Sequence, residues 1–218
     1  MNNAKNIRVN IGCGRSPTKG WLNFDNSPSI KLARSPLKFK LSRLLGLLNE
    51  SQIENVNWNR KNKIHFADAT KMLPLADSSV ETLYSSHMFE HLSREGAEFF
   101  LKDSLRVLET DGILRISVPD LKIAAQNYYI EEDANNFMNT LLVEAPKIDT
   151  LKEKLSLLFN GYRHHQWMYD GKSLSDLFRK VGFKNVVICS AGETTIQNPE
   201  GLNLFERDEQ SVFVEGSK

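Results

Sequence analysis

The chain has 218 residues, of which 40% are hydrophobic and 25% are charged, which is typical of one globular domain and excludes a disordered or collagen-like chain. The 28 Lys and Arg residues against 27 Asp and Glu residues leave a net charge of +1, so no overall field draws the protein to nucleic acid. Two cysteines, Cys13 and Cys189, are too few for a disulfide framework or a cysteine metal cluster.

The N-terminal segment MNNAKNIRVNIGCG has no apolar signal core and no small-residue cleavage site. No stretch of the sequence approaches the roughly 18 uninterrupted apolar residues that span a bilayer. We therefore expect a soluble cytoplasmic protein that forms one domain over residues 1–218.

Five strand-like segments alternate with helical ones, which predicts an α/β fold with a mainly parallel sheet. They are Arg8–Gly12, Trp21–Asp25, Lys63–Asp68, Val80–Ser86 and Gly112–Val118. Three of the five end in glycine or aspartate, at the edge where open α/β sheets bind ligands. Two later segments, Asn185–Ser190 and Ser211–Glu215, are strand-like and are expected to form an antiparallel, hairpin-like end of the sheet.

Two helices are the clearest. An apolar stripe with helical spacing runs through Arg94–Glu109. A second stripe begins at Leu174, where Ser173 and the acid three residues later resemble a capping box. Gly182 is the expected C-cap of this second helix.

Two segments lie outside the predicted sheet. Ile30–Leu48 holds five basic residues and no acidic one, and we expect a helix interrupted at Pro36 within an inserted amphipathic segment, residues 29–62. This segment is either a lid or partner contact, including a homodimer contact, or a basic helix that binds a membrane surface. Glu131–Phe159 is expected to be a pair of helices divided near Pro146.

The first candidate site is the Gly12-Cys13-Gly14 turn after the first strand. Glycine lets the backbone turn sharply and lets a ligand approach closely. A dinucleotide fingerprint would place a third glycine where this chain has Pro17, which argues against a bound pyrophosphate. The alternative is a tight turn without a ligand.

Acids at two further strand ends extend this candidate site. Asp25 could accept hydrogen bonds from both hydroxyls of a ribose, or it could cap the turn that follows. Asp68 could accept from the exocyclic amine of a purine while the Ala69 amide donates to the ring, or it could cap a turn. Three such strand ends in succession favour a ligand over coincidence.

These residues resemble a known family. Ile11-Gly12-Cys13-Gly14, Gly20-Trp21-Leu22-Asn23-Phe24-Asp25 and Asp68 are similar to the class I S-adenosylmethionine-dependent methyltransferases. Leu73–Val80, Tyr84–Leu92, Arg106-Val107-Leu108, Asp111-Gly112 and Val118–Leu121 continue the resemblance. It is strongest to small bacterial methyltransferases of polysaccharide-biosynthesis gene clusters, which His165–Asp170 and Ser211–Glu215 also resemble.

The resemblance implies a Rossmann-like, doubly wound sheet with helices on both faces and S-adenosylmethionine as cofactor. It places Gly12 and Gly14 at the methionyl part, Asp25 at the ribose and Asp68 at the adenine. The residues expected at the cofactor are Asn10, Gly12, Cys13, Gly14, Asp25, Asp68, Ala69, Ser86 and His87. Residues 131–165 would form a helical cap over the acceptor site.

Catalysis of methyl transfer requires mainly that the acceptor is held near the methyl group and that water is excluded. A general base is needed for a hydroxyl or a protonated amine. The candidates are His87 and Asp120, although His87 could instead be a structural residue at a strand end and Asp120 the N-cap of the next helix. Weaker candidates are His91, His164, His165, Tyr169 and Asp170, and we interpret His91 as structural. The spacing of His, Asp and Glu indicates no metal site.

The sequence thus predicts a methyltransferase, O-directed, that acts on a small molecule or a saccharide such as a surface-polysaccharide precursor. Nucleic acid is not expected as a partner. The alternatives are a non-catalytic S-adenosylmethionine-binding scaffold and a nicotinamide-dependent oxidoreductase. Cys13, between two glycines and without a matching histidine motif, is not expected to be a nucleophile.

Overall fold

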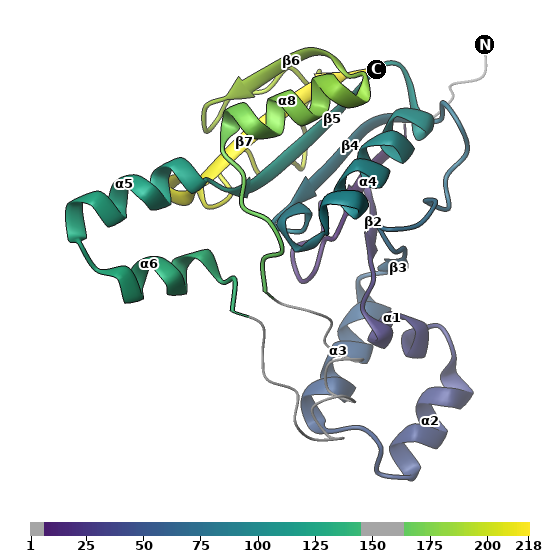
Figure 1. The fold of residues 1–218 in the computed structure, drawn as a ribbon. Coiled ribbons are helices and arrows are strands. Elements are labelled where there is room, and N and C mark those ends of the chain that lie inside the picture. Colours follow the sequence, from purple (N-terminus) through teal and green to yellow (C-terminus); the bar gives the residue numbers. More distant parts are fainter. Residues whose placement is uncertain (1–6, 145–163) are drawn as a thin grey trace.

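The computed structural model describes residues 7–144 and 164–218, which form one seven-stranded sheet of order β3-β2-β1-β4-β5-β7-β6 (Figure 1). The strands are β1 Ile7–Ile11, β2 Leu22–Asp25, β3 His65–Phe66, β4 Val80–Ser86, β5 Leu108–Pro119, β6 Lys184–Cys189 and β7 Ser211–Ser217. β1, β2, β3, β4 and β5 pair in parallel, whereas β7 pairs antiparallel with both β5 and β6. The predicted fold class, with its antiparallel end, is confirmed.

Among the strands, the largest differences from the predicted boundaries are in β3 and β5. β3 has only two residues, which pair with Phe24 and Asp25 of β2 at the edge of the sheet. β5 begins at Leu108, where a continuation of the preceding helix was expected. Leu108 is extended (φ −63°, ψ 137°) and pairs with Val80 of β4, and this pairing ends the helix two residues early.

Helices α4 (Arg94–Val107) and α8 (Gly171–Val181) contact each other on one face of the sheet (Figure 1). The capping box of α8 lies one turn before its predicted place. Asp170 is the N-cap and accepts from the Ser173 amide, while the Ser173 side chain bonds to the Asp170 backbone. Gly182, in the left-handed region at φ 119°, ends the helix as predicted.

Helices α1 (Pro28–Ala33), α2 (Pro36–Leu44) and α3 (Glu50–Lys61) follow β2. α1 contacts the short strand β3, α2 and α3, and α2 lies farther from the sheet (Figure 1). The predicted interruption at Pro36 is confirmed, because this proline begins α2. The sequence pattern did not predict α3, because its apolar periodicity is weak: Val56 and Asn59 are the buried residues of this helix. Its capping box, Asn49 with Gln52, is the local signal that marks it.

Between β5 and α8 the structure has α5 (Leu121–Glu131) and α6 (Ala134–Leu141). The predicted pair of helices from Glu131 therefore starts later, at Ala134, because Glu132 adopts a left-handed conformation that ends α5. The residues predicted to form the second helix of that pair lie outside the described residues. Two short 3-10 helices are η1 (Phe89–His91) and η2 (Asp208–Gln210).

The two faces of the sheet are covered differently. Leu83, Ile116 and Phe178 belong to the large apolar core that includes α4 and α8. On the other face Arg115 and Glu215 form a fully buried ion pair of 2.5 Å. Around this pair the cover is the connection between β6 and β7, whose backbone and side chains bond to both residues. Of the helices that the structure describes, none is long and apolar enough to cross a membrane.

Candidate active site

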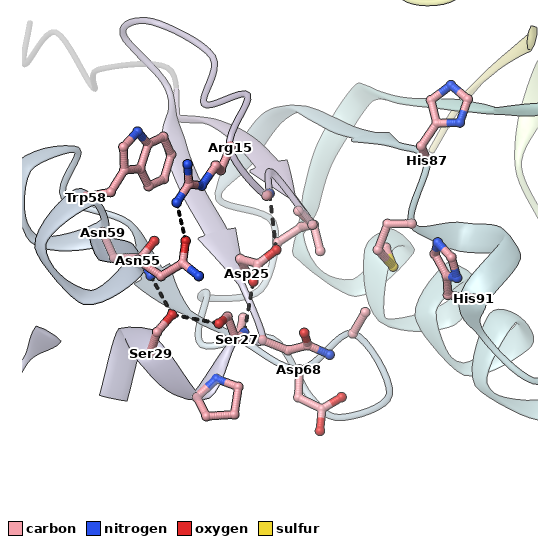
Figure 2. A pocket seen from close by; sticks show the side chains of 18 of the residues that line it. Arg15, Asp25, Ser27, Ser29, Asn55, Trp58, Asn59, Asp68, His87 and His91 are labelled. Carbon is pink, nitrogen blue, oxygen red and sulfur yellow. Dashed lines mark hydrogen bonds between the residues drawn. The ribbon is translucent and has the colours of Figure 1, made fainter. Parts of the chain in front are cut away.

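A cavity of about 750 Å³ opens where β1, β2 and β4 end (Figure 2). Its wall combines the glycine turn after β1, the segment from Asp25 to Ser29, the side of α3, residues 67–70 and the region of η1. Because the carboxyl ends of parallel strands meet at one edge, residues far apart in sequence share this wall. A cavity of this size is ordinary for a small ligand or cofactor.

The glycine turn has a structural reason for its composition. Gly12 has φ +75°, and a Cβ atom there would lie 2.4 Å from Cγ of Met88. The amides of Gly12 and Cys13 both donate to the carbonyl of Phe24, which fixes the turn against β2. Gly14 has φ +49°, and no described atom lies within 4 Å of the place where its Cβ would be. Gly14 therefore leaves an open approach to the backbone.

Asp25 lies at the centre of the wall (Figure 2). Its Oδ2 accepts from the Gly14 amide at 3.1 Å and its Oδ1 accepts from the Ser27 amide at 2.8 Å. A carboxylate can accept about four hydrogen bonds, so each oxygen retains capacity for a ligand hydroxyl. The predicted turn-capping contact and a ligand contact are thus compatible at this residue.

Asp68 also lines the cavity. Its Oδ1 accepts from the amide of Thr70 at 3.0 Å and from the Thr70 hydroxyl at 2.7 Å, and Nζ of Lys71 lies 3.4 Å from Oδ2. Burial alone would raise the pKa of Asp68, but the hydrogen bonds from Thr70 and the charge of Lys71 outweigh it and lower this pKa. The group is therefore a carboxylate, an acceptor only, at neutral pH.

Three residues expected at the cofactor are not part of the described wall: Asn10, Cys13 and Ser86. Asn10 is buried and donates to Thr18 Oγ1 at 3.0 Å, so it holds β1 to the following loop. Cys13 packs in a small core with Ile30, and burial raises the pKa of its thiol to about 12. Such a thiol is not ionised at neutral pH, which agrees with the expectation that it is no nucleophile.

The two candidate bases lie in different places. His87 lines the cavity, with Nε2 at 3.1 Å from Ser211 Oγ and the backbone amide bonded to Ser117, in a left-handed conformation (φ 48°). Asp120 is outside the described wall and caps α5 by accepting from the Lys122 amide. Burial, reinforced by the charge of Asp170, raises the pKa of Asp120. The structural alternative for Asp120, an N-cap, is the one observed.

The sequence pattern did not indicate the polar side of the cavity that α3 supplies. Ser29 Oγ accepts from Asn59 at 2.7 Å and lies 2.7 Å from Ser27 Oγ (Figure 2). Arg15 bonds to Asn55, and its guanidinium also lies over a tryptophan ring of α3. The inserted segment 29–62 therefore forms one wall of the cavity.

A buried carboxylate is the second feature of the site that the sequence pattern did not indicate. Glu90 is 1% exposed, and its Oε1 lies 3.6 Å from Nδ1 of His87 and 3.9 Å from Nε2 of both His91 and His165. Burial lowers the pKa of His165, although the charge of Glu90 opposes this shift. Linear spacing indicated no such set of residues, but the chain returns at residue 165 to complete it.

Comparisons with known proteins agree with this architecture. Residues 40–116 match the family model of a methyltransferase domain. A SAM-dependent methyltransferase from Thermotoga maritima has the same fold, with a TM-score of 0.51 and 17% identity over 97% of this chain and 82% of that one. The complex between the Haloferax volcanii Trm112 methyltransferase activator and a methyltransferase also has this fold. Its TM-score is 0.52 and its sequence identity 14%, over 97% of this chain and 82% of that one. A search of the curated proteins finds no match.

A glycine turn beside acids at neighbouring strand ends is how α/β proteins of the doubly wound class hold a nucleoside. Within this class, the matched domain and the shared fold make the chain similar to methyltransferases. The chain thus resembles the S-adenosylmethionine-dependent methyltransferases in its fold, and residues 40–116 match a methyltransferase domain.

Proposed function

We propose that the enzyme methylates a hydroxyl group of a small molecule or a saccharide, such as a surface-polysaccharide precursor. The observation that carries the hypothesis of O-methylation is that His87 and His91 line the cavity near η1, with the buried carboxylate of Glu90 next to both rings. A hydroxyl must lose its proton during methylation, which a nearby base assists. The sequence resemblance to enzymes of polysaccharide gene clusters supports a saccharide.

The residues of the wall fit the cofactor. Asp25 would accept from the ribose hydroxyls and Asp68 from the adenine amine, with Ala69 beside the ring. The turn at Gly12 and the open backbone at Gly14 would accommodate the methionyl part. S-adenosylmethionine, when bound, supplies a methyl group that is already activated on a sulfonium. The chain must then orient the acceptor and exclude water.

His87 is the preferred base. It lines the cavity, and Glu90 Oε1 lies 3.6 Å from its Nδ1, a contact that would orient the ring so that Nε2 takes a proton from the acceptor. Ser211 Oγ, 3.1 Å from Nε2, would turn aside to let the acceptor bind. Asp120 is the less suitable candidate, because its carboxylate caps α5.

The two inserted segments would complete the site. Residues 29–62 already form one wall, so a lid over the adenosyl end is the simplest role for them. Leu37 and Leu44 of α2 are more than 80% exposed, near Lys38 and Lys40, a combination that also suits a homodimer contact or a membrane surface. Residues 131–165 would cap the acceptor.

Two measurements test this function. Isothermal titration should show binding of S-adenosylhomocysteine and none of NAD, because the turn lacks a third glycine. Transfer of a radiolabelled methyl group to a panel of sugar nucleotides, glycosides and matched amino sugars should label the hydroxyl acceptors. Labelling of amino groups only would contradict O-methylation, and tight binding of NAD alone would favour an oxidoreductase.

His87→Gln tests the base, since glutamine keeps a hydrogen-bonding side chain but cannot take the proton. We expect kcat to fall by about 10²–10⁴, with little change in the affinity for S-adenosylhomocysteine. Asp120→Asn is the matched comparison and should retain most of the activity. Full activity of His87→Gln would refute the assignment.

A further inference from the structure

We propose that Glu90, His91 and His165 form a binding site for a divalent transition-metal ion, which holds an acceptor with adjacent hydroxyl groups at the end of the cavity. The inference rests on the proposed function for the identity of the acceptor. The metal site itself is argued from the geometry of the three side chains.

The donor atoms are close enough to share one ion. One ligand atom from each of the three residues lies within 4.8 Å of the other two, and Glu90 Oε1 is 3.9 Å from Nε2 of either histidine. Bonds of 2.0–2.2 Å to a common ion would place such donors about 3.0–3.5 Å apart. A shift of less than about 1 Å, within the reach of side-chain rotation, closes the set around an ion.

His91 is oriented as a metal ligand requires. Its Nδ1 lies 3.0 Å from the carbonyl oxygen of His164, and since a carbonyl only accepts, Nδ1 carries the hydrogen. In the neutral ring the lone pair is then on Nε2, the atom that faces Glu90. Histidine ligands of metals commonly donate their second nitrogen to a backbone carbonyl in this way.

Glu90 lacks the hydrogen bonds that a buried carboxylate needs. It is 1% exposed, and Oε2 has no hydrogen-bond partner in the part of the chain that the structure describes. A carboxylate that is taken out of water without compensation is strongly disfavoured. A divalent cation would supply that compensation, whereas the neighbouring histidines offer only long contacts to Oε1.

The two chain segments that carry the ligands are fixed to each other. The Gln166 amide donates to the Glu90 carbonyl at 2.8 Å, and the Gln166 side chain donates to the His91 carbonyl at 2.7 Å. These bonds hold His165 against η1 without involving any of the ligand atoms. The arrangement therefore positions the site before an ion binds, as expected of a metal centre supported by its surroundings.

The position of the cluster indicates what the ion would do. His91 and Gln166 line the same cavity as Asp25 and Asp68. An ion with three protein ligands retains open positions, and two of these would take neighbouring hydroxyl oxygens of the acceptor. Two imidazoles and one carboxylate suit Mn²⁺, Fe²⁺, Co²⁺ or Zn²⁺ better than Mg²⁺ or Ca²⁺.

The first test measures binding of Mn²⁺ and of Zn²⁺ to the chelator-treated protein by isothermal titration, with no cofactor or acceptor present. We expect one ion per chain, and a loss of affinity of at least 10-fold in Glu90→Gln and in His165→Gln. His164→Ala is the matched control, because it removes an adjacent imidazole and leaves the carbonyl that orients His91. It should bind the ion like the wild type.

S-adenosylhomocysteine binding by each variant shows that the fold and the cofactor site persist. Equal ion affinity in wild type, Glu90→Gln and His165→Gln would overturn the site, as would the absence of binding to a wild type that still binds S-adenosylhomocysteine. Ion binding without S-adenosylhomocysteine binding would leave the metal site standing and refute the proposed function.

The second test concerns the acceptor. Added Mn²⁺ or Zn²⁺ should lower KM by about 10-fold for acceptors with adjacent hydroxyls and leave KM unchanged for the matched monodeoxy acceptors. An equal effect on both kinds of acceptor would refute bidentate binding of the acceptor.

Discussion

Replacement of Gly12 by alanine should destabilise the protein, because two penalties coincide at this residue. At φ +75° an L-residue is strained by about 1–2 kcal/mol. The new Cβ would also lie 2.4 Å from Cγ and 2.6 Å from Cβ of Met88, far inside the ordinary contact distance of about 3.5–4.0 Å. Displacement of a packed side chain costs about 1–3 kcal/mol. The free energy of unfolding should therefore fall by about 2–5 kcal/mol.

Gly14→Ala is the matched control, since this residue is also left-handed but has no described atom within 4 Å of its Cβ position. Gly14→Ala should lower the free energy of unfolding only by the backbone strain, about 1–2 kcal/mol. Its added methyl group should also hinder binding of the cofactor. Urea unfolding of Gly12→Ala, Met88→Ala and the double variant gives the coupling between the two sites. We expect the double variant to recover about 1–3 kcal/mol relative to additivity. Equal losses in Gly12→Ala and Gly14→Ala, or no coupling, would refute the steric explanation.

The remaining predictions concern the cofactor, the buried ion pair and α2. Asp25→Asn should weaken S-adenosylhomocysteine binding, measured by titration, more than Asp68→Asn. Both carboxylate oxygens of Asp25 accept from backbone amides, and each such bond contributes about 1.5–3 kcal/mol. A smaller loss of affinity in Asp25→Asn than in Asp68→Asn would contradict this explanation. Burial alone would raise the pKa of Glu215, but hydrogen bonds from two threonines and the nearby guanidinium lower it. Its stabilisation is therefore present above the unfolded pKa of about 4.3 and is lost as the pH falls through the folded pKa. Urea unfolding between pH 7 and pH 3 should show that Glu215→Gln loses less stability in acid than the wild type does. An identical dependence of stability on pH in both proteins would show that Glu215 is not the group responsible. If α2 binds a membrane, Lys38→Glu/Lys40→Glu should reduce flotation with anionic liposomes. Equal flotation of the wild type and the variant, or no flotation of either, would exclude that role.

Much of the fold was predictable because its signals are local. The strand β4 was predicted over the residues it occupies, and the breaks at Pro36 and Gly182 follow from the missing amide of proline and the left-handed freedom of glycine. The signals were weaker where a neighbour decides the conformation. Leu108 is extended because Val80 pairs with it.

The candidate site divides in the same way. Glycine and aspartate at successive strand ends indicated one wall of the cavity, since the ends of parallel strands must converge. Asn10 and Cys13 belong to the same strand and turn, but only the packed structure shows that their side chains contact the protein interior and not the cavity. Sequence proximity to a binding turn does not give the direction of a side chain.

The amino-acid sequence by itself determined the class of fold and indicated one wall of the cavity, because alternating strands and helices and the residues at strand ends are short-range properties of the chain. Only the tertiary structure decided what surrounds Glu90, because a buried carboxylate acquires its histidine neighbours when distant parts of the chain pack together. His165 reaches Glu90 through the hydrogen bonds that Gln166 makes to η1, and no periodicity or spacing along the chain encodes that contact.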